Sequence, residues 1–239
     1  MQYHKDLTGK VALITGASSG IGEACARHLR ELGMQVALVA RRRERLDGII
    51  GDLGDDQALA VVGDVTDPEL AVRALAATRE KFGRVDAVIN NAGAFAVGPI
   101  EKLDAERVAN LARTNVEGAY RIAFEAVSAF KEQGSGDLIN LSSISGTKVP
   151  RAGIGWYSGT KHALEALTES LRMECAGSGV RLSCIEPGMT QTEIFAEPIT
   201  SIPRALDPDD VARTIGFVLA VPDHVTIPRL MVLPSCQPI

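Results

Sequence analysis

A tyrosine and a lysine, Tyr157 and Lys161, stand four positions apart in the segment GWYSGTK. Residues at this spacing lie side by side on a helix. A cation about 4 Å from a phenolate stabilises it by about 4 kcal/mol at an effective dielectric constant of about 20. That is roughly the free energy that lowers the pKa of a tyrosine from about 10 to near neutrality. The pair therefore predicts a tyrosine that acts as a general acid or base. An exposed pair would gain less than about 1 kcal/mol, so the prediction requires a buried site.

A glycine-rich turn follows the first apolar run of the chain. The segment TGASSGIGEA (15–24) contains Gly16, Gly20 and Gly22 between an expected strand and an expected helix. Glycines at such a turn allow a close backbone approach, and the free N–H groups of the helix start can bind a pyrophosphate. The context favours a nucleotide site over an ordinary turn.

Three arginines follow the second apolar run. A site for a cofactor without a 2′-phosphate usually has an acidic residue at this point, whereas here Ala40 is followed by Arg41, Arg42 and Arg43. A guanidinium group can bind a phosphate that carries roughly −1.5 to −2 charges. Arg41 and Arg42 therefore predict NADP(H) rather than NAD(H), and Arg43 is interpreted as a solvated residue at a helix start.

The segment GDV (63–65) ends the third apolar run. Asp64 is in a position to accept a hydrogen bond from an adenine amino group, and Val65 to pack against the adenine ring. Asp64 is equally well explained as a turn residue.

Seven short apolar runs alternate with longer amphipathic stretches. They read as nearly continuous apolar strands, which is typical of a parallel sheet covered by helices on both faces. No linker, repeat or low-complexity segment divides the chain, so we expect one doubly wound α/β domain over residues 1–239. Two helices are expected to begin at Asp-Pro pairs, with Asp67 and Asp207 as N-caps. The expected strands are 11–15, 35–40, 58–63, 86–90, 137–142, 180–187 and 229–233.

The composition argues against several classes of protein. The 239 residues are 46% hydrophobic and 23% charged, and the net charge of −5 lacks the basic surplus that attracts nucleic acid or an anionic membrane. The N-terminus has no signal-peptide pattern, and no apolar run approaches the ~18 residues of a membrane span. Four scattered cysteines form no CxxC or Cys/His pattern, so neither a disulfide framework nor a metal site is expected. We expect a cytoplasmic protein.

Six short motifs in order resemble the classical short-chain dehydrogenases/reductases over essentially the whole chain. They are TGASSGIG (15–22), NNAG (90–93), TNVEG (114–118), NLSSIS (140–145), YSGTK (157–161) and PGMTQT (187–192). The resemblance implies a single Rossmann-type domain with a seven-stranded, mostly parallel sheet. It also implies an oxidoreductase that transfers hydride between NADP(H) and a carbonyl or alcohol. Within the family the chain looks most like NADP-dependent reductases of small hydroxy acids and aldehydes.

The resemblance assigns roles to four catalytic residues. Tyr157 is implied as the general acid in reduction and the base in oxidation. Lys161 is implied to lower the pKa of that tyrosine and to bind the nicotinamide ribose, and Asn115 to hold a water of a proton relay. Ser143 is implied to polarise the carbonyl group. The spacing from Ser143 to Tyr157 is one residue longer than usual in the family, so the alternatives Ser142 and Ser145 stay open.

The resemblance also completes the expected cofactor site with residues of the NNAG and PGMTQT motifs. Together with the residues of the glycine turn, the arginines and GDV, the expected cofactor contacts are Gly16, Ser18, Ser19, Gly20, Ile21, Gly22, Arg41, Arg42, Asp64, Val65, Asn91, Ala92, Gly93, Tyr157, Lys161, Pro187, Gly188, Thr190 and Thr192.

The segment after Thr192 is expected to be a short substrate lid, at about 193–206. Its Phe195 either lines the pocket or anchors the loop, and Trp156 either walls the substrate site or packs against a loop. In relatives, the helices that correspond to 105–130 and 157–175 form an interface, so we expect a homodimer or homotetramer.

An alternative function is a non-catalytic NADP-binding regulator or scaffold of the same fold. The intact set of asparagine, serine, tyrosine and lysine argues against it, because a binding protein could lose these residues without cost.

Overall fold

Seven strands form where the apolar runs predict them, with bounds that differ by at most one residue at either end. The computed structural model describes residues 5–195 and 199–238. The strands are β1 (Val11–Thr15), β2 (Gln35–Ala40), β3 (Ala58–Val62), β4 (Ala87–Asn90), β5 (Gly136–Leu141), β6 (Val180–Pro187) and β7 (Arg229–Val232).

The strands pair in the order β3-β2-β1-β4-β5-β6-β7, and every neighbouring pair is parallel. The predicted mostly parallel sheet is therefore confirmed. From β1 the chain moves outward to β2 and β3 and then returns to the other side of β1 as β4. This reversal creates a crevice at the carboxyl ends of β1 and β4, the place where open α/β sheets bind ligands.

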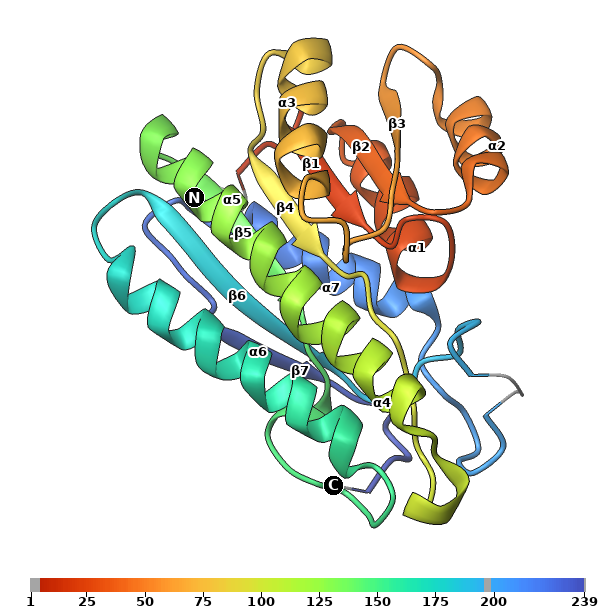
Figure 1. Cartoon of the computed structure of the whole chain (residues 1–239). Coiled ribbons are helices and arrows are strands. Elements are labelled where there is room, and N and C mark those ends of the chain that lie inside the picture. Colours follow the sequence, from red (N-terminus) through yellow and green to blue (C-terminus); the bar gives the residue numbers. More distant parts are fainter. Residues whose placement is uncertain (1–4, 196–198, 239) are drawn as a thin grey trace.

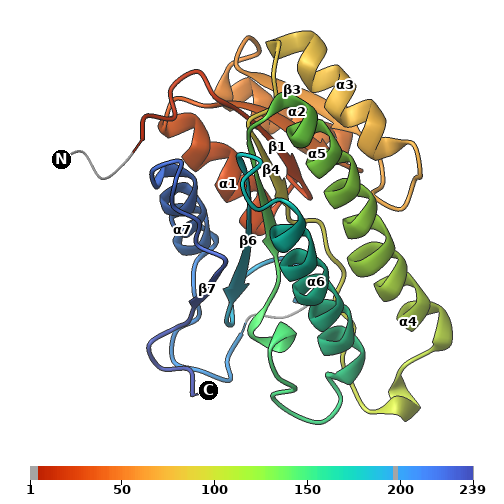
Figure 2. The same ribbon diagram turned by 90° about the vertical axis from the view of Figure 1, so that its left-hand side faces the viewer.

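Helices cover both faces of this sheet (Figures 1 and 2). On one face, the buried sides of α1, α2 and α7 form a core with the sheet, and on the other α3, α5 and α6 do so. The helix α4 leads into α5 through a π-helical stretch, η2. The helices are α1 (Gly20–Glu31), α2 (Arg43–Leu53), α3 (Leu70–Phe82), α4 (Ala105–Ala112), η2 (Arg113–Gly118), α5 (Ala119–Gln133), α6 (Gly155–Glu174) and α7 (Pro208–Ala220).

One of the two predicted helix starts is confirmed and the other is wrong. Asp207 caps α7 in a capping box with Asp210, and Pro208 is the first helical residue. In contrast, α3 begins at Leu70 rather than after Asp67. The carboxylate of Asp67 instead accepts a hydrogen bond from the backbone N–H of Glu69 at 3.0 Å, which closes a turn before the helix begins.

The connections differ between the amino ends and the carboxyl ends of the parallel strands, called here the amino edge and the carboxyl edge of the sheet. At the amino edge, α3 and α5 end in tight turns at Gly83 and Gly134, whose φ angles are +78° and +73°. At the carboxyl edge, the loops after β4 and β5 contain the 3-10 turns η1 (Ile100–Lys102) and η3 (Ile144–Gly146). Within the described ranges, no helix combines the length and apolar character that crossing a membrane requires.

Candidate active site

A cleft of about 800 Å³ opens at the carboxyl edge of the sheet. Its lining joins segments from the whole length of the chain, because all the parallel strands end at this edge. Two of the predicted site residues, Gly22 and Asn115, lie outside the lining. The predicted residues that line it are Gly16, Ser18, Ser19, Gly20, Ile21, Arg41, Arg42, Asp64, Val65, Asn91, Ala92, Gly93, Ser143, Tyr157, Lys161, Pro187, Gly188, Thr190 and Thr192.

The glycine turn has the shape that a phosphate cradle requires. Gly16 and Gly20 have φ angles of +66° and +55°, a conformation that favours glycine. A Cβ atom at Gly22 would overlap the carbonyl oxygen of Gly16, so Gly22 permits close packing within the turn rather than lining the cleft. Ser19, the N-cap of α1, makes no side-chain capping hydrogen bond. The N–H groups at the start of α1 are therefore left for an anion.

Asn91 and Thr15 tie the end of β4 to the glycine turn. The backbone N–H groups of Asn91 and Ala92 both donate to the hydroxyl of Thr15 at 3.0 Å, and the side-chain amide of Asn91 donates to the carbonyl oxygen of Thr15 at 2.8 Å. Thr15 is fully buried. The NNAG motif therefore braces the floor of the cleft between β1 and β4.

Ser143 is the one of the three candidate serines that is hydrogen-bonded to Tyr157. The backbone N–H of Ser145 donates to the Ser143 hydroxyl at 3.1 Å, which leaves the O–H of Ser143 free to donate. The hydroxyl of Ser142 is buried against Gly146 and has no hydrogen-bond partner among the described residues. The extra residue before Tyr157 is therefore accommodated without moving Ser143 away from the phenol.

Tyr157 is not acidic in this arrangement, so that expectation is wrong, and the role of Lys161 in lowering the pKa of the phenol stays a prediction. The ammonium group of Lys161 donates to the carbonyl oxygen of Leu141 at 2.7 Å and lies 5.8 Å from the centre of the Tyr157 ring. Burial raises the pKa of Tyr157 to about 12, although the hydrogen bond from Ser143 opposes the rise. Burial also lowers the pKa of Lys161 to about 8, against the attraction of the neighbouring Cys184 and Glu165. In both groups desolvation of the charged form is the largest effect.

The side chain of Asn115 is engaged with the loop after β4. Its amide oxygen accepts from the backbone N–H of Ala94 at 2.7 Å, and its amide nitrogen donates to the carbonyl oxygen of Ala94 at 2.9 Å and to the Thr160 hydroxyl at 3.2 Å. Asn115 belongs to η2, and π-helical distortions are frequent at functional sites. The side chain thus fixes a loop of the cleft, and its role in a proton relay stays a prediction.

The arginines at the end of β2 differ in how they are engaged. Arg41 is 78% exposed and has, among the described residues, one ion pair, to Asp64 at 3.5 Å. Arg42 donates to the hydroxyl and the carbonyl oxygen of Ser18 and to the carboxylate of Glu193. Asp64 also accepts from the backbone N–H and the hydroxyl of Thr66. It therefore serves as a turn residue and lines the cleft as well.

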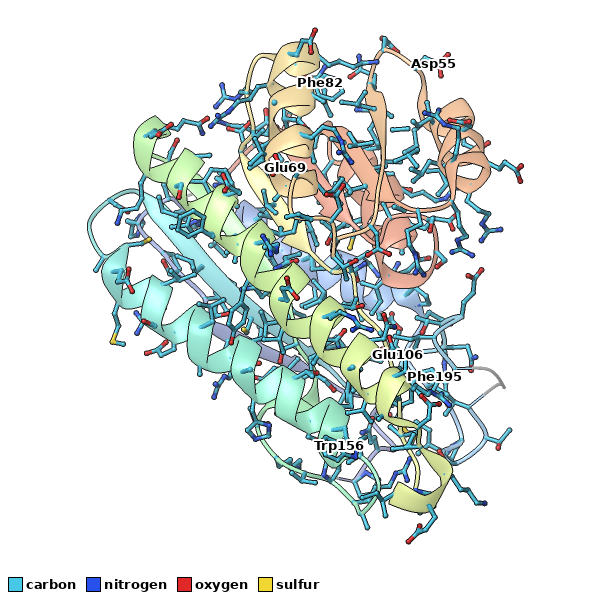
Figure 3. All side chains as sticks on the ribbon, in the orientation of Figure 1. Asp55, Glu69, Phe82, Glu106, Trp156 and Phe195 are labelled. Atoms are coloured by element: carbon cyan, nitrogen blue, oxygen red, sulfur yellow. The ribbon has the colours of Figure 1, made fainter. Side chains whose placement is uncertain are left out.

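Phe95, which the sequence motifs did not single out, packs against the phenol. Phe95 lies two residues after the NNAG motif. Its ring packs edge-on against the rings of Tyr157 and Phe195, at centroid distances of 4.9 and 5.0 Å. Phe195 lines the cleft, as the first alternative proposed, while Trp156 is half exposed at the start of α6 and does not line it (Figure 3). Residues 196–198 of the predicted lid lie outside the described residues.

Glu193 and Gln237 are two further lining residues without a predicted role. The Gln237 side chain accepts from the backbone N–H of Met189 at 2.8 Å, which fastens the C-terminal segment to the loop after β6. Glu193 follows the PGMTQT motif directly and carries a charge opposite to that of the arginine run, a signal that could have suggested their pairing.

The sequence matches the family model of short chain dehydrogenases over residues 10–201. An uncharacterized oxidoreductase of Staphylococcus aureus (strain N315) is 36% identical over 228 residues, which cover 95% of this chain and 98% of that protein.

Two solved structures resemble this one along nearly their whole length. The 3-ketoacyl-(acyl-carrier-protein) reductase from Brucella melitensis, complexed with NADH, has a TM-score of 0.87 at 33% identity, with 95% of this chain and 97% of that chain covered. The alcohol dehydrogenase from the archaeon Thermococcus sibiricus, complexed with 5-hydroxy-NADP, has a TM-score of 0.87 at 31% identity, with 96% and 98% covered. The chain belongs to the short-chain dehydrogenase/reductase family of oxidoreductases.

Proposed function

We propose that the protein is an NADP(H)-dependent oxidoreductase that transfers hydride between the nicotinamide and a carbonyl or alcohol substrate, such as an aldehyde, a ketone or a small hydroxy acid. The observation that carries the proposal is that Ser143, Tyr157 and Lys161 share one cleft with the glycine turn. The nicotinamide cofactors of the two solved relatives support the same class of cofactor.

The residues of the cleft fit a dinucleotide. The uncapped start of α1 and the turn at Gly16 and Gly20 would hold the pyrophosphate. Ala40 ends β2 without an acidic residue, and the exposed Arg41 beside it would favour a 2′-phosphate over a free ribose hydroxyl. When bound, the cofactor supplies the hydride.

Tyr157 is placed to exchange the proton. With its pKa at about 12 the phenol is protonated at neutral pH, so in reduction it can donate its proton to the substrate oxygen. The hydroxyl of Ser143 would stabilise negative charge that develops on that oxygen. In oxidation the same phenol oxygen would take the proton back from the alcohol.

Lys161 would favour proton donation by Tyr157 through its charge. With its pKa at about 8 it is mostly cationic at neutral pH, and it lies 5.8 Å from the tyrosine ring. Loss of the phenol proton leaves a phenolate, which a nearby cation stabilises. The ammonium group and the side chain of Asn115 both lie near Gly93: a Cβ atom added to Gly93 would be 4.0 Å from the Lys161 nitrogen and 3.5 Å from the Asn115 amide oxygen. The absence of a side chain at Gly93 would leave room for the water of the proposed proton relay.

The test is the loss of reduced-nicotinamide absorbance with NADPH and with NADH against a panel of aldehydes, ketones and keto acids. We expect turnover with NADPH, and a loss of about 10²–10⁴-fold in Tyr157→Phe with little change in the Kd for NADPH. Tyr120→Phe is the matched control, because the Tyr120 hydroxyl donates to the carbonyl oxygen of Ala163 outside the cleft. NADPH binding without turnover of any carbonyl would instead favour the non-catalytic regulator or scaffold.

We further propose a cytoplasmic homodimer or homotetramer. Phe124 on α5 is 67% exposed and Met173 on α6 is 60% exposed, which supports an interface formed by these helices. The cysteines are free thiols, in keeping with a reducing compartment. Light scattering on the purified protein tests the proposed oligomer, and a monomer at micromolar concentration would contradict it.

A further inference from the structure

Glu193 is held by two arginines and a serine at the rim of the cleft. Its carboxylate pairs with Arg42 at 2.9 Å and with Arg45 at 3.1 Å, and the side chain of Ser19 is also hydrogen-bonded to it. These contacts join the segment after β6 to the start of α2 and to the turn before α1. The pair between Arg42 and Glu193 spans 151 positions of sequence.

Two of the groups that hold Glu193 are also groups expected to hold the cofactor. Ser19 precedes the uncapped start of α1, and Arg42 is the N-cap of α2, just after β2, where the 2′-phosphate is predicted. Within the described part of the chain, the guanidinium group of Arg42 donates its hydrogen bonds to Ser18 and to Glu193. The carboxylate of Glu193 is therefore already paired with Arg42, an arginine that is predicted to bind the 2′-phosphate.

The charges around this point are balanced. Among the described residues, Arg41, Arg42 and Arg45 face three carboxylates, those of Asp64, Glu193 and Glu23, so the cluster has no net charge. A phosphate with roughly −1.5 to −2 charges is attracted to this cluster less than the three arginines alone would suggest. Removal of the Glu193 charge would raise the net charge to +1 and free the Arg42 nitrogen that now pairs with Glu193.

We infer that Glu193 is a specificity-determining residue: its carboxylate competes with the 2′-phosphate of NADP(H) for Arg42 and thereby limits the preference for NADP(H) over NAD(H). This inference rests on the proposed nicotinamide cofactor and adds to it a residue that weakens rather than supports 2′-phosphate binding. Since NADH has the same pyrophosphate but no 2′-phosphate, the competition acts on the ratio of the two affinities.

The test is calorimetric titration of the wild type and of Glu193→Gln with NADPH and NADH at low ionic strength. We expect the Kd for NADPH to fall by roughly 3- to 10-fold in the variant and the Kd for NADH to change by less than about twofold. Adenosine 2′-monophosphate, titrated in the same way, should gain affinity like NADPH. Added salt should reduce the difference, because the interaction takes place at half-exposed residues.

Asp47→Asn is the matched control. Asp47 pairs with Arg43 within α2, is as exposed as Glu193 and does not line the cleft. The substitution Asp47→Asn removes one negative charge, as Glu193→Gln does. We expect it to leave the ratio of the NADPH and NADH affinities unchanged. A ratio that shifts equally in both variants would overturn the inference, since overall charge would then explain it.

The other outcomes separate the inference from the proposed function. If Glu193→Gln leaves the ratio unchanged, or weakens NADPH and NADH alike, Glu193 is not a competitor and the inference is overturned. If the wild type prefers NADH but the variant shifts toward NADPH, the proposed NADP(H) preference fails while the inference is supported. If the wild type binds neither nucleotide, the proposed function fails and the inference falls with it.

Discussion

The ammonium group of Lys161 donates a 2.7 Å hydrogen bond to the main-chain carbonyl oxygen of Leu141, the last residue of β5. Ser143 follows the end of β5 by two residues. The end of this strand therefore helps to position both the Lys161 ammonium group and the Ser143 hydroxyl beside Tyr157. The carbonyl dipole stabilises the ammonium group, but the loss of water around it costs more, and the pKa of Lys161 falls to about 8.

This lowered pKa predicts how stability depends on pH. Unfolded lysine keeps its proton up to about pH 10.5, whereas folded Lys161 loses it above about pH 8. Between these values the unfolded state binds more protons, so stability increases with pH. We expect the free energy of unfolding of the wild type to rise relative to Lys161→Met by about 3 kcal/mol across this range. Urea unfolding of both proteins at a series of pH values measures it, and a constant difference would contradict the lowered pKa.

Substitution of Ser143 and of Ser142 should affect activity differently. Ser143→Ala removes the hydroxyl that contacts the phenol, and we expect kcat to fall by about 10²-fold. Ser142→Ala removes a buried hydroxyl without a partner among the described residues, so stability should stay within about 1 kcal/mol and activity should be largely kept. Steady-state kinetics on the best substrate of the panel decides between them. Loss of activity in Ser142→Ala alone would show that the catalytic serine had been misassigned.

Asn115→Ala should destabilise the protein, because the asparagine makes two hydrogen bonds to the backbone of Ala94 and is 1% exposed. Leaving the backbone groups of Ala94 without these partners should lower the free energy of unfolding by about 1–3 kcal/mol. Asn110→Ala, on the preceding helix α4, is the control and should change it by less than about 0.5 kcal/mol. Equal effects of the two substitutions in denaturant unfolding would contradict the bracing role of Asn115.

Two glycine-to-alanine changes should have opposite signs. In Gly22→Ala the new Cβ would overlap the Gly16 carbonyl oxygen and crowd the amide of Asn91, so we expect a loss of about 1–3 kcal/mol and weaker NADPH binding. Gly48 lies within α2 with nothing near its Cβ position, and Gly48→Ala should stabilise the protein by about 0.5–1 kcal/mol. Thermal unfolding and NADPH titration measure both. A stabilised Gly22→Ala would mean that the turn is looser than its packing indicates.

The strands and the sheet were predictable from the sequence because they depend on local patterns. An apolar run bounded by glycine or polar residues defines a buried strand wherever it lies, and the ends of β1, β2 and β6 match the runs residue for residue. The start of α3 was missed because Asp67 has two local uses, as an N-cap or as the closing residue of a turn. Only the path of the backbone after Pro68 distinguishes them.

Most residues of the predicted site line one cleft, but the sequence did not indicate which partners their side chains contact. The YSGTK spacing located Tyr157 and Lys161, yet the direction of the shift in the tyrosine pKa depends on how deeply the fold buries the phenol. Likewise, the arginine run indicated a phosphate site, while its pairing with Glu193 depends on a contact between segments far apart in sequence. Spacing within one segment carries no information about such contacts.

The tight turns at Gly83 and Gly134 lie at the edge of the sheet opposite the cleft, and the Cβ position of each glycine has open space around it. The cleft with the proposed cofactor and substrate contacts lies at the other edge, so we expect changes in these two turns to leave the chemistry unaffected. They are the natural positions at which to open the chain for circular permutation, or to insert an affinity tag or a fluorescent reporter that leaves the cleft accessible.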